Sequence, residues 1–222
     1  MTDQQRRTGL LKQLLRNFIV LLAMGTCCLS AAKQPLPNVL LKTDLGDMLI
    51  ELYPQQAPIS VDNFLKYVDD FYYDGIIFHR VIQGFMIQAG GFSFDLSIKP
   101  PNSAPIINES ANGLANERGT LAMARTFDPD SATSQFFINH RTNRSLDHRG
   151  KRPGYAVFGR VIQGMDTLDK IAAVETATVG YMKDVPVEPV RILSARLLNP
   201  ESWSPLPEAD DKPSFEAPIP VR

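Results

Sequence analysis

The sequence has little of what several protein classes require. Its 222 residues include two cysteines (Cys27 and Cys28), three histidines and one tryptophan. A disulfide-built scaffold is therefore excluded beyond residue 28, and the spacings of His79, His140 and His148 match no familiar metal-ligand pattern. Basic residues number 23 and acidic residues 24, so the basic excess typical of nucleic-acid-binding proteins is missing. We expect no nucleic-acid partner, no metal and no other cofactor.

The first 32 residues differ in composition from the rest. Basic residues at 6, 7, 12 and 16 precede an apolar run over 18–29, and small residues follow at 30–32. This order predicts a secretory signal peptide over 1–32 and a periplasmic location; the alternative is an uncleaved leader that anchors the protein in the membrane. Without the leader the chain has 19 basic and 23 acidic residues and no cysteine. Such a chain can enter an oxidising compartment with no thiol to mispair.

Residues 33–198 are predicted to form one domain. Short apolar runs bounded by turn residues predict many β-strands, starting with 39–43 and 48–52 around a Gly-containing turn. Helical periodicity appears at 58–68 and 165–172. We therefore expect a mainly β fold, a closed antiparallel β-barrel whose ends are covered by two α-helices. Residues 199–222 are rich in proline and acids, which predicts a flexible tail that is either solubilising or a binding segment.

Three segments carry a family resemblance. They are FHRVIQGFMIQ at 78–88, ATSQFFIN at 132–139 and YAVFGRVIQGMD at 155–166. In this order they resemble the cyclophilin family of peptidyl-prolyl cis-trans isomerases, and the stretch from 121 to 139 is especially similar to its exported bacterial branch. The resemblance covers about residues 38–198 and implies a barrel of eight antiparallel strands, capped by two helices, with the active face on its outside.

The resemblance also implies an activity and site residues. The activity is the isomerisation of X-Pro bonds in proline-containing polypeptides, which assists the folding of exported proteins. Arg80 matches the catalytic arginine, and Gln88 matches the side chain that orients it. The matching proline pocket consists of Phe85, Met86, Phe137 and Leu146, and the matching peptide groove of Ala124, Arg125, Gln135 and Tyr155.

Three positions depart from the family pattern. Gln83 replaces a proline in a turn, and Arg125 replaces an asparagine common in eukaryotic members. Ser145 stands where a tryptophan or phenylalanine usually lines the pocket. Because that tryptophan favours cyclosporin binding in many relatives, we expect weak cyclosporin binding, and a smaller area for the proline ring.

Plainer interpretations stand beside these expectations. Apolar residues such as Phe85, Met86 and Phe137 are usually core, and a lone arginine such as Arg80 usually forms a surface ion pair. A second function is a chaperone module that binds proline segments with little turnover, which the altered pocket at Ser145 would favour. For either function we expect a monomer.

Overall fold

The computed structural model describes residues 35–206. The predicted signal peptide and residues 207–222 of the predicted tail lie outside this range. Among the helices of the described residues, none has the length and hydropathy needed to cross a bilayer.

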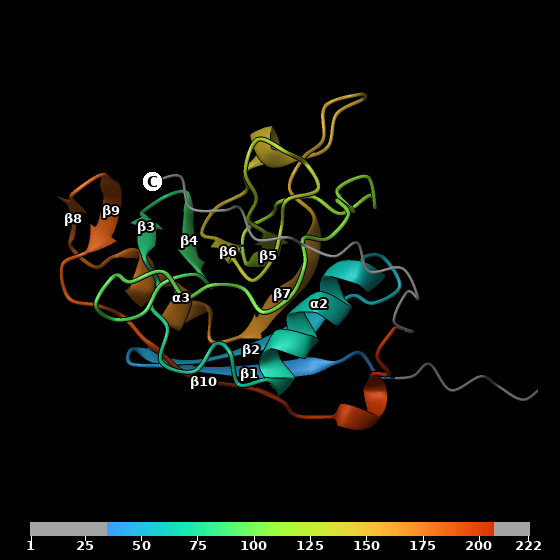
Figure 1. Ribbon diagram of the computed structural model, residues 1–222, viewed down its shortest axis with the longest axis horizontal. Coiled ribbons are helices and arrows are strands. Elements are labelled where there is room, and N and C mark those ends of the chain that lie inside the picture. Colours follow the sequence, from blue (N-terminus) through green and yellow to red (C-terminus); the bar gives the residue numbers. More distant parts are fainter. Residues whose placement is uncertain (1–34, 207–222) are drawn as a thin grey trace, which may run out of the picture. The chain divides into compact units, whose positions relative to one another are not determined.

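The described chain is mainly β-structure, as predicted. Eight strands form one antiparallel sheet with the order β10-β1-β2-β7-β5-β6-β4-β3 (Figure 1). In chain order they are β1 (Asn38–Thr43), β2 (Gly46–Leu52), β3 (Arg80–Ile82), β4 (Met86–Ala89), β5 (Thr120–Met123), β6 (Phe136–Asn139), β7 (Val157–Gln163) and β10 (Ile192–Leu197). Two further strands, β8 (Thr176–Val179) and β9 (Met182–Pro186), pair with each other as a hairpin that was not predicted from the sequence.

The first hairpin shows how the sequence determines local structure. In β1, Val39 and Leu41 are fully buried while Lys42 is exposed, which is the period-two alternation of a strand with one face on the core. Thr43 pairs with Gly46 across a two-residue turn. Gly46 has φ +132°, a conformation that favours glycine, and its carbonyl accepts a hydrogen bond from the Thr43 hydroxyl at 2.6 Å.

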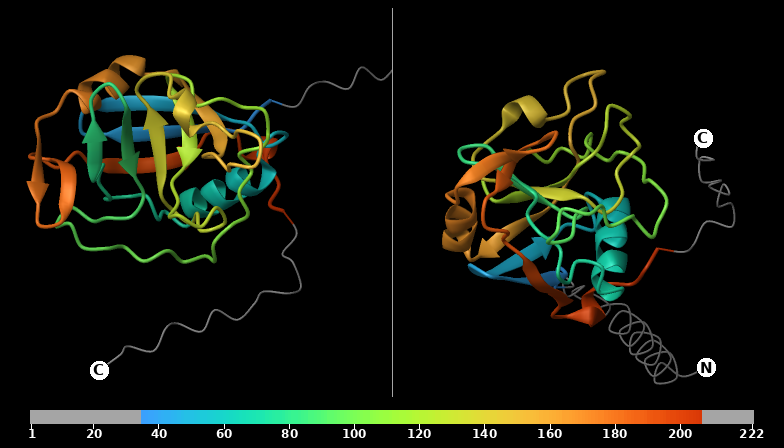
Figure 2. Two further views of the ribbon diagram at one scale, coloured as in Figure 1. Left: turned by 90° about the horizontal axis from the view of Figure 1, so that it is seen from above. Right: turned by 60° about the vertical axis from the view of Figure 1, so that its left-hand side comes forward.

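The sheet curls strongly, but the prediction of a closed barrel is met only in part (Figure 2). The end strands β10 and β3 do not pair with each other in the ladder. The segments that lead into them are nevertheless joined. The Phe78 amide donates to the Val190 carbonyl at 2.9 Å, and the Ile192 amide donates to the Ile76 carbonyl at 2.8 Å.

Two α-helices lie on opposite sides of the curled sheet (Figure 2). Helix α2 (Pro58–Asp69) begins with proline at its first turn, where a missing N–H costs nothing. Glu109 caps this end, because its carboxylate accepts the amides of Ile59 and Ser60 at 3.0 and 2.7 Å. Helix α3 (Met165–Ala172) has the bounds that the periodicity predicts. Both helices bury one apolar face against the sheet.

The main core fills the concave side of the sheet. Phe64 of α2 lies at its centre, with ring centroids 5.1 Å from Tyr73, 5.4 Å from Phe136 and 5.3 Å from Phe158. All four side chains are fully buried. Offset and edge-on contacts of this kind add to the stabilisation that area burial supplies.

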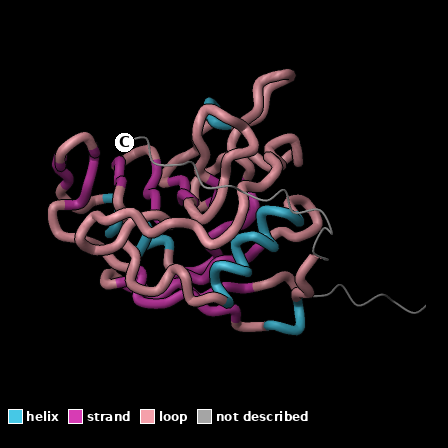
Figure 3. The backbone as a smooth tube through the Cα atoms, in the orientation of Figure 1, coloured by secondary structure: helices cyan, strands magenta, loops and turns pink. Residues whose placement is uncertain are grey.

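Long connections surround the sheet, the longest between β4 and β5 (Figure 3). The first residues of the predicted flexible tail adopt a defined structure, contrary to the prediction. Residues 200–202 form the short helix η2, and Trp203 packs against the core. Asn199 anchors this segment, since its side chain accepts the Asn38 amide at 2.8 Å and donates to the Leu36 carbonyl at 2.9 Å.

Candidate active site

Strand alternation builds a second, smaller apolar cluster on the outer face of the sheet. Its buried members are Met86 on β4, Ala122 on β5, Phe137 on β6 and Val157 on β7. Their chain neighbours Ile87, Leu121, Phe136 and Phe158 all point into the main core. Partly buried side chains complete the outer cluster: Ile82, Phe85, Leu114, Ala124, Leu146 and Tyr155. The structure therefore brings together the predicted pocket residues Phe85, Met86, Phe137 and Leu146.

One row of paired residues crosses the outer face and connects the arginine to the cluster. Arg80 pairs with Gln88, Gln88 with Phe137, Phe137 with Ala122, and Ala122 with Val157. Residues paired directly across strands point to the same face. Adjacent strands are about 4.8 Å apart, so the Arg80 backbone lies about 10 Å from that of Phe137, within reach of an extended arginine side chain. We call these five residues the site row.

Arg80 is not buried in a structural ion pair. Its side chain is 42% exposed, and its nearest carboxylate among the described residues is that of Asp184, with Nε and Oδ2 3.6 Å apart. Asp184 belongs to β9 and has φ +61°. Asp184 was not predicted as a site residue, because nothing in the sequence indicates that the 176–186 hairpin packs beside β3.

Three of the four predicted groove residues line a small hollow next to the site row, together with Gln88. Gln88, Ala124, Arg125 and Gln135 share this hollow of about 190 Å³. The Gln88 side-chain amide donates to the side-chain oxygen Oε1 of Gln135 at 2.9 Å, so within the described residues its partner is Gln135 rather than Arg80. The side-chain amides of Gln88 and Gln135 therefore lie side by side in this hollow.

Arg125 and Tyr155 form the far wall of the site. The Arg125 guanidinium lies over the Tyr155 ring at 4.6 Å and donates to the carbonyls of Gly154, Pro153 and Thr126. Tyr155 in turn meets Phe137 edge-on, with centroids 5.5 Å apart. This stack forms one boundary of a second hollow of about 530 Å³, which Leu146 and Ser145 also line. Ser145 is exposed and adds little apolar surface there.

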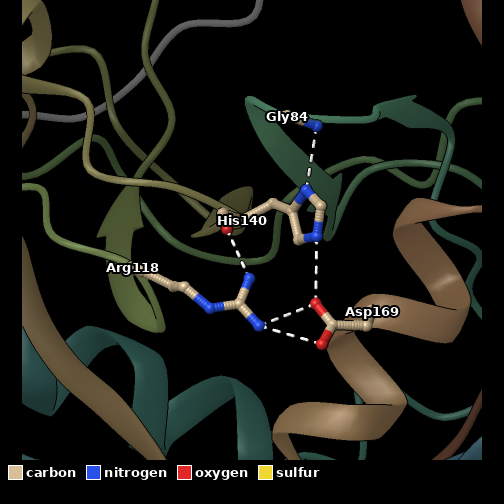
Figure 4. A network of polar contacts seen from close by, with 4 residues as sticks. All are labelled: Gly84, Arg118, His140 and Asp169. Carbon is tan, nitrogen blue, oxygen red and sulfur yellow. Dashed lines mark hydrogen bonds and ion pairs between the residues drawn. The ribbon is translucent and has the colours of Figure 1, made fainter.

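A polar network holds the turn between β3 and β4 (Figure 4). The Gly84 amide donates to His140 Nδ1 at 2.9 Å, which leaves the ring proton on Nε2, 3.0 Å from Asp169. Arg118 donates to both Asp169 oxygens and to the His140 carbonyl, and its hydrogen bonds lower the pKa of Asp169. The His140 amide also donates to the Phe85 carbonyl at 3.0 Å. His140 therefore orients the turn that carries the pocket.

His79, which precedes Arg80, lies in a buried environment, in contrast to the hydrogen-bonded His140. His79 is 4% exposed and its ring packs against that of Phe92 at a tilt of 44°, with centroids 4.5 Å apart. Its Nδ1 has no hydrogen-bond partner among the described residues. Burial, and then the charge of Arg80, lower its pKa to about 4, so His79 is neutral near pH 7. Within the described residues no group of three His, Cys, Asp or Glu side chains could hold a metal ion.

Comparisons with known proteins agree with this geometry. Residues 38–197 match the family model described as "Cyclophilin type peptidyl-prolyl cis-trans isomerase/CLD". The chain is 53% identical over 178 residues to the peptidyl-prolyl cis-trans isomerase of Acinetobacter baylyi, covering 80% of this chain and 94% of the relative. It is 50% identical over 155 residues to peptidyl-prolyl cis-trans isomerase B of Escherichia coli, covering 68% and 94%.

A solved structure is similar in fold. The crystal structure of a Cryptosporidium parvum cyclophilin type peptidyl-prolyl cis-trans isomerase matches with a TM-score of 0.61 and 27% identity, over 73% of this chain and 97% of that one. The match in fold, the family model and the relatives about half identical in sequence all agree. The chain belongs to the cyclophilin type peptidyl-prolyl cis-trans isomerase family and is an isomerase of X-Pro peptide bonds.

Proposed function

We propose that Arg80 drives the isomerisation by donating a hydrogen bond to the prolyl nitrogen while the outer cluster holds the proline ring. The observation that carries this role is the site row, which aligns a half-exposed arginine with Gln88 and Phe137 on one face. The substrates are proline-containing polypeptides.

The chemistry of the amide explains why a cation is needed. Delocalisation of the nitrogen lone pair into the carbonyl gives the peptide bond a rotation barrier of about 18–20 kcal/mol. In the twisted transition state this delocalisation is lost, and the nitrogen becomes a hydrogen-bond acceptor. A positioned guanidinium therefore binds the twisted form better than either planar isomer, and such differential binding lowers the barrier. Arginine suits this role because it stays charged and presents a planar set of donors.

Arg80 does not supply the whole effect. An acceleration of about 10⁵ requires about 7 kcal/mol, whereas a hydrogen bond to a charged group contributes about 1.5–3 kcal/mol. The remainder comes from the apolar surface of Phe85, Met86, Phe137 and Leu146, which fixes the ring and excludes water from the rotating bond. Gln88, Gln135, Ala124, Arg125 and Tyr155 bind the flanking backbone. In support, the Cryptosporidium parvum relative has also been crystallised in the presence of the dipeptide Ala-Pro.

The variant Arg80→Ala tests the mechanism. We expect kcat/KM on a proline peptide to fall on the order of a hundredfold, about 2.7 kcal/mol of transition-state stabilisation. Exchange NMR spectroscopy measures the rate without a coupled protease. The matched control is Arg160→Ala, which removes another half-exposed arginine with a loose carboxylate partner, Glu117 at 3.6 Å. Wild-type activity in Arg80→Ala would refute the mechanism.

A binding module with little turnover is the second candidate function. The exposed Ser145 favours it, because the proline ring has less apolar surface there. The same NMR experiment separates the two functions. Peptide binding without faster exchange between the isomers would favour the module.

We further propose that the protein is exported and assists folding in the periplasm. The order of basic, apolar and small residues over 1–32 supports cleavage after Ala32. Amino-terminal sequencing of the protein from a periplasmic fraction tests this proposal. A chain that still begins at Met1 in the membrane fraction would favour the anchored alternative.

We make three finer proposals, on the closure of the barrel, the oligomeric state and the affinity for cyclosporin. The sheet closes into a barrel through the backbone bonds between 76–78 and 190–192, which join the segments beside its end strands. The isomerase acts as a monomer. Its affinity for cyclosporin is weak, because Ser145 offers no aromatic surface to the drug. Fluorescence titration with cyclosporin checks this affinity, and nanomolar binding would contradict it.

A further inference from the structure

The loop at residues 141–152, here called the basic loop, has a composition unlike the rest of the chain. It contains five basic residues and one acidic residue, whereas the remainder of the chain has 18 basic and 23 acidic residues. In Figure 1 this gold segment, which includes η1 (Arg144–Leu146), stands out from the sheet. The basic residues are Arg141, Arg144, Arg149, Lys151 and Arg152, and all are exposed.

The charges of the basic loop are not neutralised within residues 35–206. None of its five basic side chains forms an ion pair with a carboxylate of these residues. Asp147, its one acid, instead accepts the amide and side chain of Asn116 at 2.7 and 3.1 Å. A concentrated positive field of this kind attracts anionic groups and raises their local concentration.

Internal hydrogen bonds hold the basic loop in one shape. Arg149 and Arg152 exchange backbone hydrogen bonds at 3.0 and 2.9 Å. The side chain of Arg149 donates to the Arg144 carbonyl at 2.8 Å, and that of Arg152 donates to the Ser145 carbonyl at 3.2 Å. The cations are therefore presented on a structured surface, which reduces the entropy lost when a partner binds.

The basic loop is continuous with the active site. The hollow of about 530 Å³ is lined by Arg152 of the loop, by Arg125, and by Leu146 and Tyr155 of the outer cluster. Among the described residues, no carboxylate lines it. An anionic side chain in this hollow would lie near two guanidinium groups while a neighbouring proline occupies the pocket.

We infer that the basic loop is a specificity surface for acidic residues close to the isomerised proline. This inference rests on the proposed function, because it assumes that the outer cluster binds the proline. An anionic membrane could also be attracted to exposed cations. The shared hollow favours a peptide, because it places the charge beside the proline pocket.

The test compares peptides that differ in a single side chain. Glu, Gln or Lys is placed two residues before or two residues after the proline, and kcat/KM is measured by exchange NMR on the full chain. At low ionic strength we expect the Glu peptide to exceed its Gln counterpart by about three- to tenfold on one side of the proline, and the Lys peptide to be poorer. Screening should remove the difference in 1 M salt, where the Debye length is about 3 Å.

A pair of matched variants assigns the effect to the basic loop. Lys151→Gln/Arg152→Gln removes two loop charges, and Lys42→Gln/Lys170→Gln removes two exposed charges from β1 and α3. The ratio of Glu to Gln rates should approach one in the first variant and stay at the wild-type value in the second. Because each ratio is taken within one protein, a general change in activity cancels. If the loop variant does not fold, the salt titration of the wild type still tests whether the preference for Glu is electrostatic.

Three outcomes would overturn the inference. Equal rates on Glu and Gln peptides at low salt would show no acidic preference, while activity on the Gln peptide would still support the isomerase. An equal loss of preference in both variants would assign the effect to overall charge. Loop-dependent cosedimentation with phosphatidylglycerol vesicles, combined with equal peptide rates, would assign the loop to a membrane instead. No activity on any peptide would refute the proposed function itself.

Discussion

The two faces of the central strands use the same kind of residue for different purposes. Phe136 and Phe137 are consecutive on β6 and both are almost fully buried, at 0% and 4% exposure. Phe136 belongs to the main core, while Phe137 belongs to the outer cluster beside the site row. Burial alone therefore does not distinguish core from site. The distinction comes from strand alternation, since a shift of one residue moves a side chain to the opposite face.

The largest expected effect separates these two phenylalanines. Phe136→Ala should leave a closed cavity among Phe64 and Tyr73 and reduce the free energy of unfolding by about 3–5 kcal/mol. Phe137→Ala enlarges a site that opens to solvent, so we expect a smaller loss of about 1–2 kcal/mol, together with at least a tenfold fall in kcat/KM. Urea unfolding and exchange NMR measure the two quantities.

Each phenylalanine variant serves as the control for the other. If Phe136→Ala does not fold, the milder Phe136→Leu should still lose stability while retaining most of its activity per folded molecule. Equal losses of stability and activity in the two positions would show that the faces are not functionally distinct.

A second difference between the faces concerns charge, at the neighbours His79 and Arg80. The pKa of His79 is about 4 in the folded protein and near 6.5 in an unfolded chain. The unfolded state therefore binds a proton that the folded state excludes, and stability should fall as the pH drops from about 6.5 to about 4. The contribution of His79 to this loss is about 3 kcal/mol, because each pKa unit corresponds to about 1.4 kcal/mol.

Replacing the buried histidine isolates its share of the pH dependence. In His79→Leu, urea unfolding at pH 7 and at pH 4 should differ by about 3 kcal/mol less than in the wild type. The control His148→Gln removes an exposed histidine. It shows how much the dependence of the unfolding free energy on pH changes when any histidine is lost. If the unfolding free energy of His79→Leu depends on pH as in the wild type, protonation of His79 does not destabilise the folded protein.

Much of the site could be predicted from local sequence patterns. The apolar, β-rich runs at 85–88, 120–124 and 136–138 predict strands, and the family resemblance supplied Arg80 and the pocket residues that the structure brings together. Helix α3 has its predicted bounds because its periodicity is regular. What could not be predicted depends on long-range packing. The packing of the β8–β9 hairpin beside β3, the His140 network and the packing of Trp203 join residues far apart in the chain, and no local pattern predicts such contacts.

Asp184 is the least predictable member of the site, and it should give the smallest effect. Its carboxylate lies 3.6 Å from Arg80 Nε, and both side chains are about 40% exposed. Exposed pairs contribute about 0–1 kcal/mol, so we expect Asp184→Asn to lower kcat about two- to fivefold and to leave the free energy of unfolding within about 0.5 kcal/mol. We expect kcat to fall rather than rise because of the geometry of the pair. A partner at Nε restrains the Arg80 side chain while leaving its terminal N–H groups free for the substrate. Without this partner the guanidinium is aligned with the substrate less often. Asp166→Asn, which breaks an exposed pair with Lys170 on α3, is the matched control and should leave kcat unchanged. A rise in kcat would mean that Asp184 competes with the substrate for Arg80, and the outer face would then use its charged pair to restrain activity rather than to position the arginine.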